Sequence, residues 1–144
     1  MDVSHGKYLG VDYGDKRTGL AECDVTGFLA SGITTVSEGG MRKTAERVAK
    51  EAIARNCKKI IIGLPRNMDG SEGPRADVIK AFAALLSEIT DIPIDFYDER
   101  MSTMAAYRFL DGTSTYGKRR REVIDTLSAE IILQSYIDRE RKSK

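Results

Sequence analysis

The sequence predicts an α/β fold in which one mixed sheet is flanked by helices. Two observations support this prediction. Three strand-like segments near the start are joined by short turns, as in an antiparallel meander. After them, short β-branched segments alternate with segments whose apolar residues have helical spacing, as in parallel strands joined by helices. The chain has 144 residues and no repeat or linker, so we expect a single domain that spans residues 1–144.

The meander opens on a carboxylate inside an apolar strand. We expect its strands at residues 7–13, 17–24 and 28–36. Because strand side chains alternate, Asp12 shares a face with Gly10, and Leu9, Val11 and Tyr13 point to the other face. Lys16 and Arg17 in the following turn place two cations beside this acid. An ordinary hairpin in which Asp12 caps the turn is the alternative.

The later elements follow from apolar periodicity, a β-branched run and proline placement. The run Ile60 to Ile62 is typical of a strand buried on both faces, and Pro74 suits the first turn of a helix. We expect a helix from Met41 to about Asn56, a strand at 59–63, a helix from Pro74, a strand at 92–97, a short helix from Ser102 or Thr103 to about Leu110, and a final helix at about 119–139.

Composition excludes several classes of protein. The net charge is +1, so any binding of nucleic acid must come from local basic patches. No apolar run approaches the ~20 residues that span a bilayer, and Met1 to Lys7 lacks the apolar stretch of a signal peptide. Cys23 and Cys57 form no C-x-x-C pair, and the single histidine, His5, argues against a histidine triad or zinc site. We therefore expect a cytoplasmic protein that does not associate with membranes.

Three acids on separate elements need an explanation. Asp12 lies in the first strand, and Glu99 follows the last strand at its carboxyl end, where open α/β sheets bind ligands. Asp125 shares the apolar face of the final helix, since Ala129, Ile132 and Tyr136 follow it at helical spacing. Each acid alone has a structural alternative, such as a solvated strand end for Glu99 or a local hydrogen bond for Asp125.

Together, the three acids predict a metal site. Clustered carboxylates repel one another unless a divalent cation compensates for their charge. Carboxylate ligands suit Mg²⁺ or Mn²⁺, and two such ions about 3.5–4 Å apart can assist phosphodiester hydrolysis. The sequence therefore predicts a metal-dependent nuclease with two ions held by Asp12, Glu99 and Asp125.

Four segments resemble the YqgF family, whose members are described as candidate pre-16S rRNA nucleases or Holliday-junction-resolvase-like proteins. They are residues 8–21, 60–74, 98–103 and 119–138, in the family's order and over nearly the whole chain. The resemblance implies a ribonuclease-H-like fold with a five-stranded mixed sheet. It also implies that the three acids match the family's acidic positions and that the substrate is the 5′ end of pre-16S rRNA. Ser128 and Met101-Ser102 depart from the usual residues, and neither departure touches the acids.

Cations near the acids are candidate contacts to the substrate. The glycine-marked loop at 63–73 leaves a buried strand and feeds a helix N-terminus, which offers N–H groups to an anion. The alternative for this loop is a plain connection between the strand and the helix. For the basic run at 118–121, the alternative is a group of charges that only faces solvent. The candidate residues are Lys16, Arg17, Arg66, Asn67, Arg100, Arg119 and Arg120.

Three other functions stay open at this point. A Holliday junction resolvase acting on branched DNA would require a symmetric dimer, because two strands must be cut, so the chain is expected as a monomer or a homodimer. A phosphotransfer ATPase is the second open function, because the segment around Asp12 also resembles the phosphate loop of the actin and sugar-kinase group. Those proteins clamp the nucleotide between two lobes, whereas this chain is expected to have one. A non-catalytic nucleic-acid-binding protein or transcription factor would not need all three acids.

Overall fold

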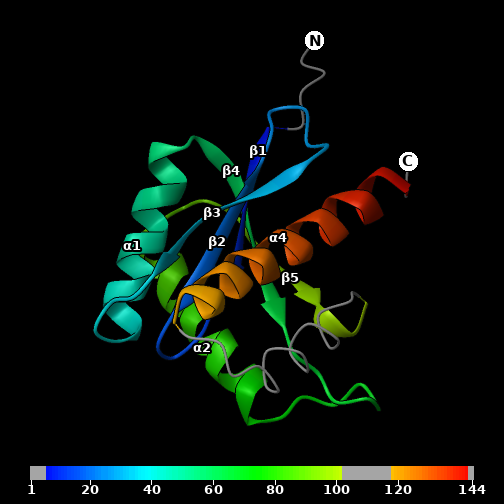
Figure 1. The fold of residues 1–144 in the computed structure, drawn as a ribbon. Coiled ribbons are helices and arrows are strands. Elements are labelled where there is room, and N and C mark those ends of the chain that lie inside the picture. Colours follow the sequence, from blue (N-terminus) through cyan, green and yellow to red (C-terminus); the bar gives the residue numbers. More distant parts are fainter. Residues whose placement is uncertain (1–5, 102–117, 143–144) are drawn as a thin grey trace.

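The computed structural model describes residues 6–101 and 118–142, and within the last helix its side chains from Thr126 onward. The chain forms one five-stranded sheet of order β3-β2-β1-β4-β5 (Figure 1). Its strands are β1 (Lys7–Asp12), β2 (Thr18–Cys23), β3 (Ala30–Val36), β4 (Cys57–Leu64) and β5 (Ile94–Asp98). The pairs β1–β2 and β2–β3 are antiparallel, while β4 is parallel to β1 and β5 is parallel to β4. The predicted meander followed by parallel strands is confirmed.

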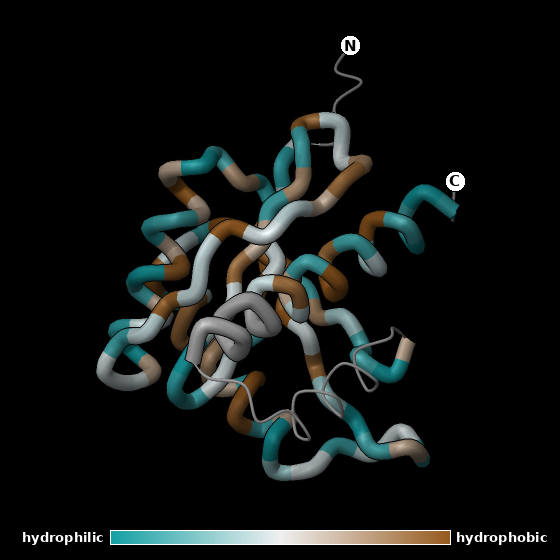
Figure 2. Tube along the Cα trace, viewed as in Figure 1, coloured by the Kyte–Doolittle hydropathy of each residue, from teal (hydrophilic) through white to brown (hydrophobic). Residues whose placement is uncertain are grey.

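Helices cover both faces of the sheet. Helices α1 (Met41–Ala54) and α2 (Pro74–Ile89) pack on one face, and α4 (Lys118–Lys142) crosses the other (Figure 1). Apolar residues gather where these helices meet the sheet, and hydrophilic residues lie along the outer helix faces (Figure 2). A short 3₁₀ helix, η1 (Glu99–Met101), follows β5. The short helix predicted to end near Leu110 lies outside the described residues.

Strand β1 lies at the centre of both apolar layers. Leu9 and Val11 are fully buried in the layer under α1 and α2. Gly10 faces α4, where an added Cβ would lie 2.8 Å from the Leu133 Cβ and 2.9 Å from the Ala129 carbonyl oxygen. The predicted alternation of β1 is therefore confirmed, and the missing side chain of Gly10 allows α4 to pack closely on the strand.

Local residues explain where several elements begin and end. Helix α1 stops at Ala54, and Asn56 takes a left-handed conformation with φ 58° that turns the chain into β4. Helix α2 begins at Pro74, as predicted, because proline suits the first helical position. Strand β4 is longer than the predicted 59–63, because pairing with β1 and β5 continues its ladder in both directions.

Helix α4 also covers the β3 edge of the sheet. The Ala30 N–H donates to Gln134 Oε1 at 2.8 Å, and the Gly32 N–H donates to Glu130 Oε1 at 3.0 Å. Residues two apart along a strand and four apart along a helix both advance about 6 to 7 Å, so the two contacts can form together. This edge of the sheet is thereby blocked at two of the groups that could pair with another strand.

Candidate active site

Two of the three expected acids meet at the carboxyl end of the parallel strands. Asp12 is the last residue of β1, and Glu99 directly follows β5. Both line a hollow of about 180 Å³, named here the acid hollow, whose other described lining residues are Tyr13, Pro65, Arg75 and Ile79. Since the parallel strands β1, β4 and β5 end together here, the topology itself brings Asp12 and Glu99 to one place.

Glu99 lies in a space that a glycine leaves open. Its residue surface is only 8% exposed. An added Cβ on Gly63 in β4 would lie 3.0 Å from Glu99 Oε2 and 2.5 Å from Ile132 Cδ1. Gly63 is therefore required for the Glu99 carboxylate to occupy its position beneath α4.

The neighbours of Glu99 form a separate ion pair. Arg100 donates from Nη2 to Asp98 Oδ2 at 2.7 Å, and its backbone N–H donates to Asp98 Oδ1 at 2.9 Å. The Arg100 hydrogen bonds hold the pKa of Asp98 below its usual value. Arg100 also donates to the Met68 carbonyl oxygen at 3.4 Å, which links η1 to the loop after β4. Arg100 therefore lies next to Glu99 in the chain, and its guanidinium is paired with Asp98.

Arg75 lines the acid hollow and is not among the predicted residues. It lies in the first turn of α2, donates from Nη2 to the Tyr13 carbonyl oxygen, and pairs through Nη1 with Asp15 Oδ1 at 3.2 Å. Its guanidinium carbon is 5.7 Å from the centre of the Tyr13 ring. A cation in the first turn of a helix opposes the helix dipole, and this signal in Gly73-Pro74-Arg75 could have identified it.

The loop after β4 has an ordered shape built from its own polar groups. The Asn67 N–H donates to the Ser71 carbonyl oxygen at 2.9 Å, and Asn67 Nδ2 donates to Ser71 Oγ at 3.0 Å. Arg66 pairs with Glu72 at 3.3 Å. Arg66 and Asn67, the two residues of this loop that are predicted to contact the substrate, therefore lie beyond the same end of the sheet as the acids. Their described contacts are to other residues of the loop.

Lys16 and Arg17 lie in the turn that directly follows β1. Lys16 is exposed, and its carbonyl oxygen accepts a hydrogen bond from Ser37 Oγ at 3.2 Å. Arg17 is half-buried. The turn also carries Asp15, the partner of Arg75, so it reaches the edge of the acid hollow.

The side chains of Asp125, Arg119 and Arg120 lie outside the described residues, although all three belong to α4. Later in α4, Ala129 and Ile132 are fully buried and Tyr136 is 8% exposed, which confirms that part of the predicted apolar face. Within the described side chains, no three His, Cys, Asp or Glu residues form a group that could hold a metal ion. The three-acid metal site therefore stays a prediction.

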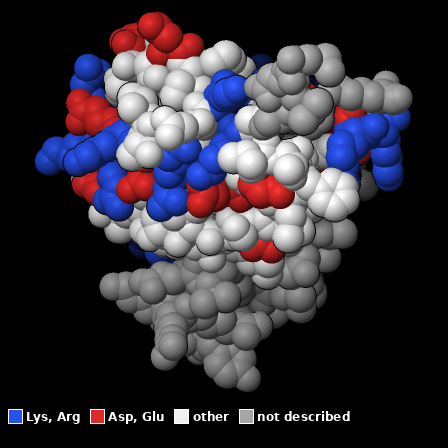
Figure 3. All heavy atoms as spheres, turned by 90° about the horizontal axis from the view of Figure 1, so that it is seen from above, with Lys and Arg blue, Asp and Glu red and all other residues white. Residues whose placement is uncertain are grey.

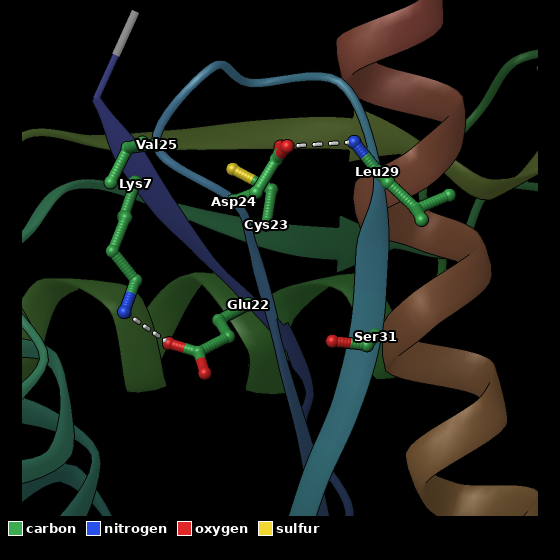
Figure 4. Close-up of a pocket in the computed structure, with 7 residues that line it drawn as sticks. All are labelled: Lys7, Glu22, Cys23, Asp24, Val25, Leu29 and Ser31. Atoms are coloured by element: carbon green, nitrogen blue, oxygen red, sulfur yellow. Dashed lines mark hydrogen bonds and ion pairs between the residues drawn. The ribbon is translucent and has the colours of Figure 1, made fainter.

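A larger hollow of about 480 Å³ lies at the other end of the sheet, beside the β2–β3 turn (Figure 4). Its main charged groups are already paired, because Glu22 binds Lys7 at 2.8 Å and Arg55 at 3.0 Å. Seen from above, positive and negative side chains are interspersed over the described part of the surface (Figure 3). The acid hollow is the better candidate, because it joins carboxylates to a cation at the carboxyl ends of the strands.

The helices of the described part of the chain include none that is long and apolar enough to cross a membrane.

Comparisons with solved structures identify the fold. RuvC of T. thermophilus in complex with a Holliday junction substrate superposes with a TM-score of 0.62 at 13% identity, covering 96% of this chain and 98% of that one. The fowlpox virus resolvase with Holliday junction DNA gives a TM-score of 0.53 at 13% identity, covering 93% and 98%. These likenesses show the fold alone and confirm the ribonuclease-H-like architecture.

Comparisons of sequence identify the family. A relative from Ruegeria sp. (strain TM1040) is 45% identical over 133 residues, covering 92% of this chain and 85% of its own length, and is named as a candidate pre-16S rRNA nuclease. A relative from Caldanaerobacter subterraneus subsp. tengcongensis has the same name and is 39% identical over 138 residues, covering 95% and 99%. The family model described as "RuvX: Holliday junction resolvase" matches residues 6–139. The chain therefore belongs to the RuvX family, the same family that its sequence resembles under the name YqgF.

Proposed function

We propose that this protein is a metal-dependent nuclease that hydrolyses phosphodiester bonds during 5′-end maturation of pre-16S rRNA. The observation that carries the proposal is the acid hollow, where Asp12, the last residue of β1, meets Glu99, the first residue after β5. The names of the relatives supply the substrate class. We propose a cytoplasmic location, because the relatives that carry this name come from bacteria, in which rRNA is transcribed in the cytoplasm.

The residues present fit a divalent ion. Asp12 and Glu99 offer carboxylate oxygens, the ligands that suit Mg²⁺ or Mn²⁺. Gly63 leaves open the space that the Glu99 carboxylate fills. We propose that Asp12 binds two ions, that Glu99 completes one site, and that Asp125 completes the other and orients water. When bound, such ions supply positive charge that stabilises the attacking and leaving oxygens of the phosphodiester.

The cations around the acid hollow would hold the substrate strand. An arginine has five N–H donors, so Arg66 and Arg100 can contact phosphate with donors that Glu72 and Asp98 do not use. The candidate contacts are Lys16, Arg17, Arg66, Asn67, Arg100, Arg119 and Arg120. Phosphate contacts of this kind position a nucleic acid without reading its sequence.

Branched DNA is the second candidate substrate, favoured by the description of the matching family. A resolvase would act as a homodimer, whereas cleavage of one RNA strand needs only a monomer. Size-exclusion chromatography with light scattering separates the two states. A non-catalytic nucleic-acid-binding protein would bind either substrate and cleave neither.

The test is a cleavage assay with a labelled pre-16S rRNA fragment and a labelled four-way junction, with Mg²⁺, Mn²⁺ or EDTA. We expect cleavage of the rRNA fragment only with a divalent ion, and its loss in Asp12→Asn, Glu99→Gln and Asp125→Asn. Asp138→Asn, in the exposed part of α4, is the matched control that should keep full activity. Cleavage that persists in EDTA or in all three variants would refute the metal site.

Metal binding has a second measurement that does not depend on cleavage. An ion that binds only the folded protein raises its melting temperature. Mn²⁺ should therefore raise the melting temperature of the unchanged protein and of Asp138→Asn, and should have little effect on the variants at the three acids. An equal shift in all of them would show that Mn²⁺ binds elsewhere.

A further inference from the structure

We propose that Arg75 binds a phosphate of the substrate in the acid hollow, and that Asp15 occupies its guanidinium until the substrate displaces it. This inference rests on the proposed function and adds a substrate-binding residue to it. It also explains why an exposed carboxylate lies at the edge of a site for a polyanion.

The position of Arg75 carries the first step. Of the six described residues that line the acid hollow, two are the acids Asp12 and Glu99, and Arg75 is the cation. Carboxylates repel a phosphate, so a cation on the same hollow offsets part of that repulsion. Arg75 also lies in the first turn of α2, a helix of 16 residues whose N-terminus favours an anion.

One side of the guanidinium is held by fixed groups. Nη2 donates to the carbonyl oxygen of Tyr13, which directly follows β1. The guanidinium carbon lies 5.7 Å from the centre of the Tyr13 ring, and that ring stacks on Phe82 at 4.3 Å between centres. Tyr13 is 6% exposed and Phe82 is fully buried, so these contacts have little freedom to move. Arg75 is therefore aimed before any substrate binds.

The other side is held by a group that can leave. Nη1 pairs with Asp15 Oδ1 at 3.2 Å, but the Asp15 side chain is 76% exposed. Asp15 lies in the turn between β1 and β2, outside both strands. An exposed ion pair of this kind is weak, whereas a phosphate can accept two parallel bonds from a guanidinium. A phosphate entering the acid hollow can thus replace the Asp15 carboxylate on Nη1 while the Tyr13 contact stays.

A purely structural function of Arg75 makes a different prediction. If Arg75 only tied α2 to the turn after β1, removing either Arg75 or Asp15 would loosen the same contact, and both changes would act in the same direction. Exchange of Asp15 for a phosphate predicts opposite directions, because Asp15 competes with the substrate and Arg75 binds it.

The experiment measures the KM and kcat of cleavage of the labelled pre-16S rRNA fragment, together with its affinity in EDTA. We expect Arg75→Gln to raise KM and weaken affinity about tenfold, with Arg75→Lys in between because lysine keeps the charge and loses the paired donors. Asp15→Asn should lower KM about two- to fivefold. In the variant with both Arg75→Gln and Asp15→Asn, the gain from Asp15→Asn should vanish.

Asp138→Asn is the matched control, because it removes an exposed carboxylate from another arginine pair, with Arg141 at 2.7 Å. It should change neither KM nor affinity, and melting temperatures of all variants check folding. The inference is overturned if Arg75→Gln leaves KM and affinity unchanged, if Asp15→Asn does not lower KM, or if that gain persists without Arg75. Failure of the unchanged protein to cleave or bind the fragment would overturn the proposed function instead.

Discussion

Replacing Gly63 by alanine separates the packing of α4 from the placement of Glu99. The added Cβ would lie 2.5 Å from Ile132 Cδ1 and 3.0 Å from Glu99 Oε2, and both distances are shorter than ordinary contacts. Gly63 is not among the glycines with a positive φ, so its backbone accepts alanine. The two close approaches are therefore the direct consequences of the substitution.

The cost in stability follows from the Ile132 contact. Forcing an extra methyl group into a packed core costs about 1–3 kcal/mol, and the lost flexibility of glycine in the unfolded chain returns about 0.4–1 kcal/mol. We expect Gly63→Ala to lower the free energy of unfolding by about 1–2 kcal/mol. Ile132→Val alone should cost about 0.5–1.5 kcal/mol. It removes Cδ1, the atom nearest to the added Cβ, and leaves Cγ1 at 3.2 Å, so the variant with both changes should lose less stability than the sum of the two single changes.

The effect on activity follows from the Glu99 contact. The carboxylate must move by a few tenths of an ångström to make room for the Cβ. If Glu99 holds a metal ion as proposed, its distance to the ion tolerates about 0.2 Å, and changes in the residues that position metal ligands typically cost 10- to 100-fold in affinity or activity. We expect kcat to fall at least tenfold in Gly63→Ala, and we expect the additional Ile132→Val change to relieve the clash in the core without restoring kcat.

Urea unfolding and the rRNA cleavage assay measure the two effects on the same preparations. Gly39→Ala is the control, because no atom lies within 4 Å of an added Cβ there, and it should keep full activity. If Gly63→Ala kept full kcat, or if the additional Ile132→Val change restored kcat, the placement of Glu99 would not be what Gly63 protects.

Three further predictions concern the turn after β2, the buried thiols and the sheet edge. A hydrogen bond from the Thr26 hydroxyl and two from backbone N–H groups lower the pKa of Asp24 to about 2. The stabilisation by the charged carboxylate is therefore present above about pH 4 and is lost as the pH falls through 2. Asp24→Ala should lower the melting temperature at pH 7, and its difference from the unchanged protein should shrink as the pH falls from about 4 to about 2, whereas an equal difference at both ends would refute this reasoning. Burial raises the pKa of Cys57 to about 11, so iodoacetamide at pH 8 should leave it unmodified until urea unfolds the protein, and rapid labelling of the folded protein would contradict its burial. Changing Glu130 and Gln134 to alanine removes the acceptors of two β3 N–H groups. The change should lower the free energy of unfolding in urea by about 1–2 kcal/mol and increase self-association in size-exclusion chromatography. An unchanged elution profile would show that α4 is not needed to protect this edge of the sheet.

The sequence by itself determined the order of the five strands and of α1, α2 and α4, and the end of the sheet where Asp12 and Glu99 lie, whereas it did not predict η1. These features depend on local patterns, such as the alternation around Gly10 and the proline that opens α2. The resemblance to a known family added the ribonuclease-H-like topology, which the superposed structures confirm. Metal binding by Asp125 together with Asp12 and Glu99 remains a prediction from the sequence.

The tertiary structure decided which side chains surround the acids. It placed Arg75 in the acid hollow, assigned Arg100 to Asp98, and showed that Gly63 makes room for Glu99 beneath Ile132. Apart from the Arg100 pair, these contacts join segments that are far apart along the chain. Periodicity reports only which way a residue faces on its own element, and the packing of one element on another determines what that residue meets.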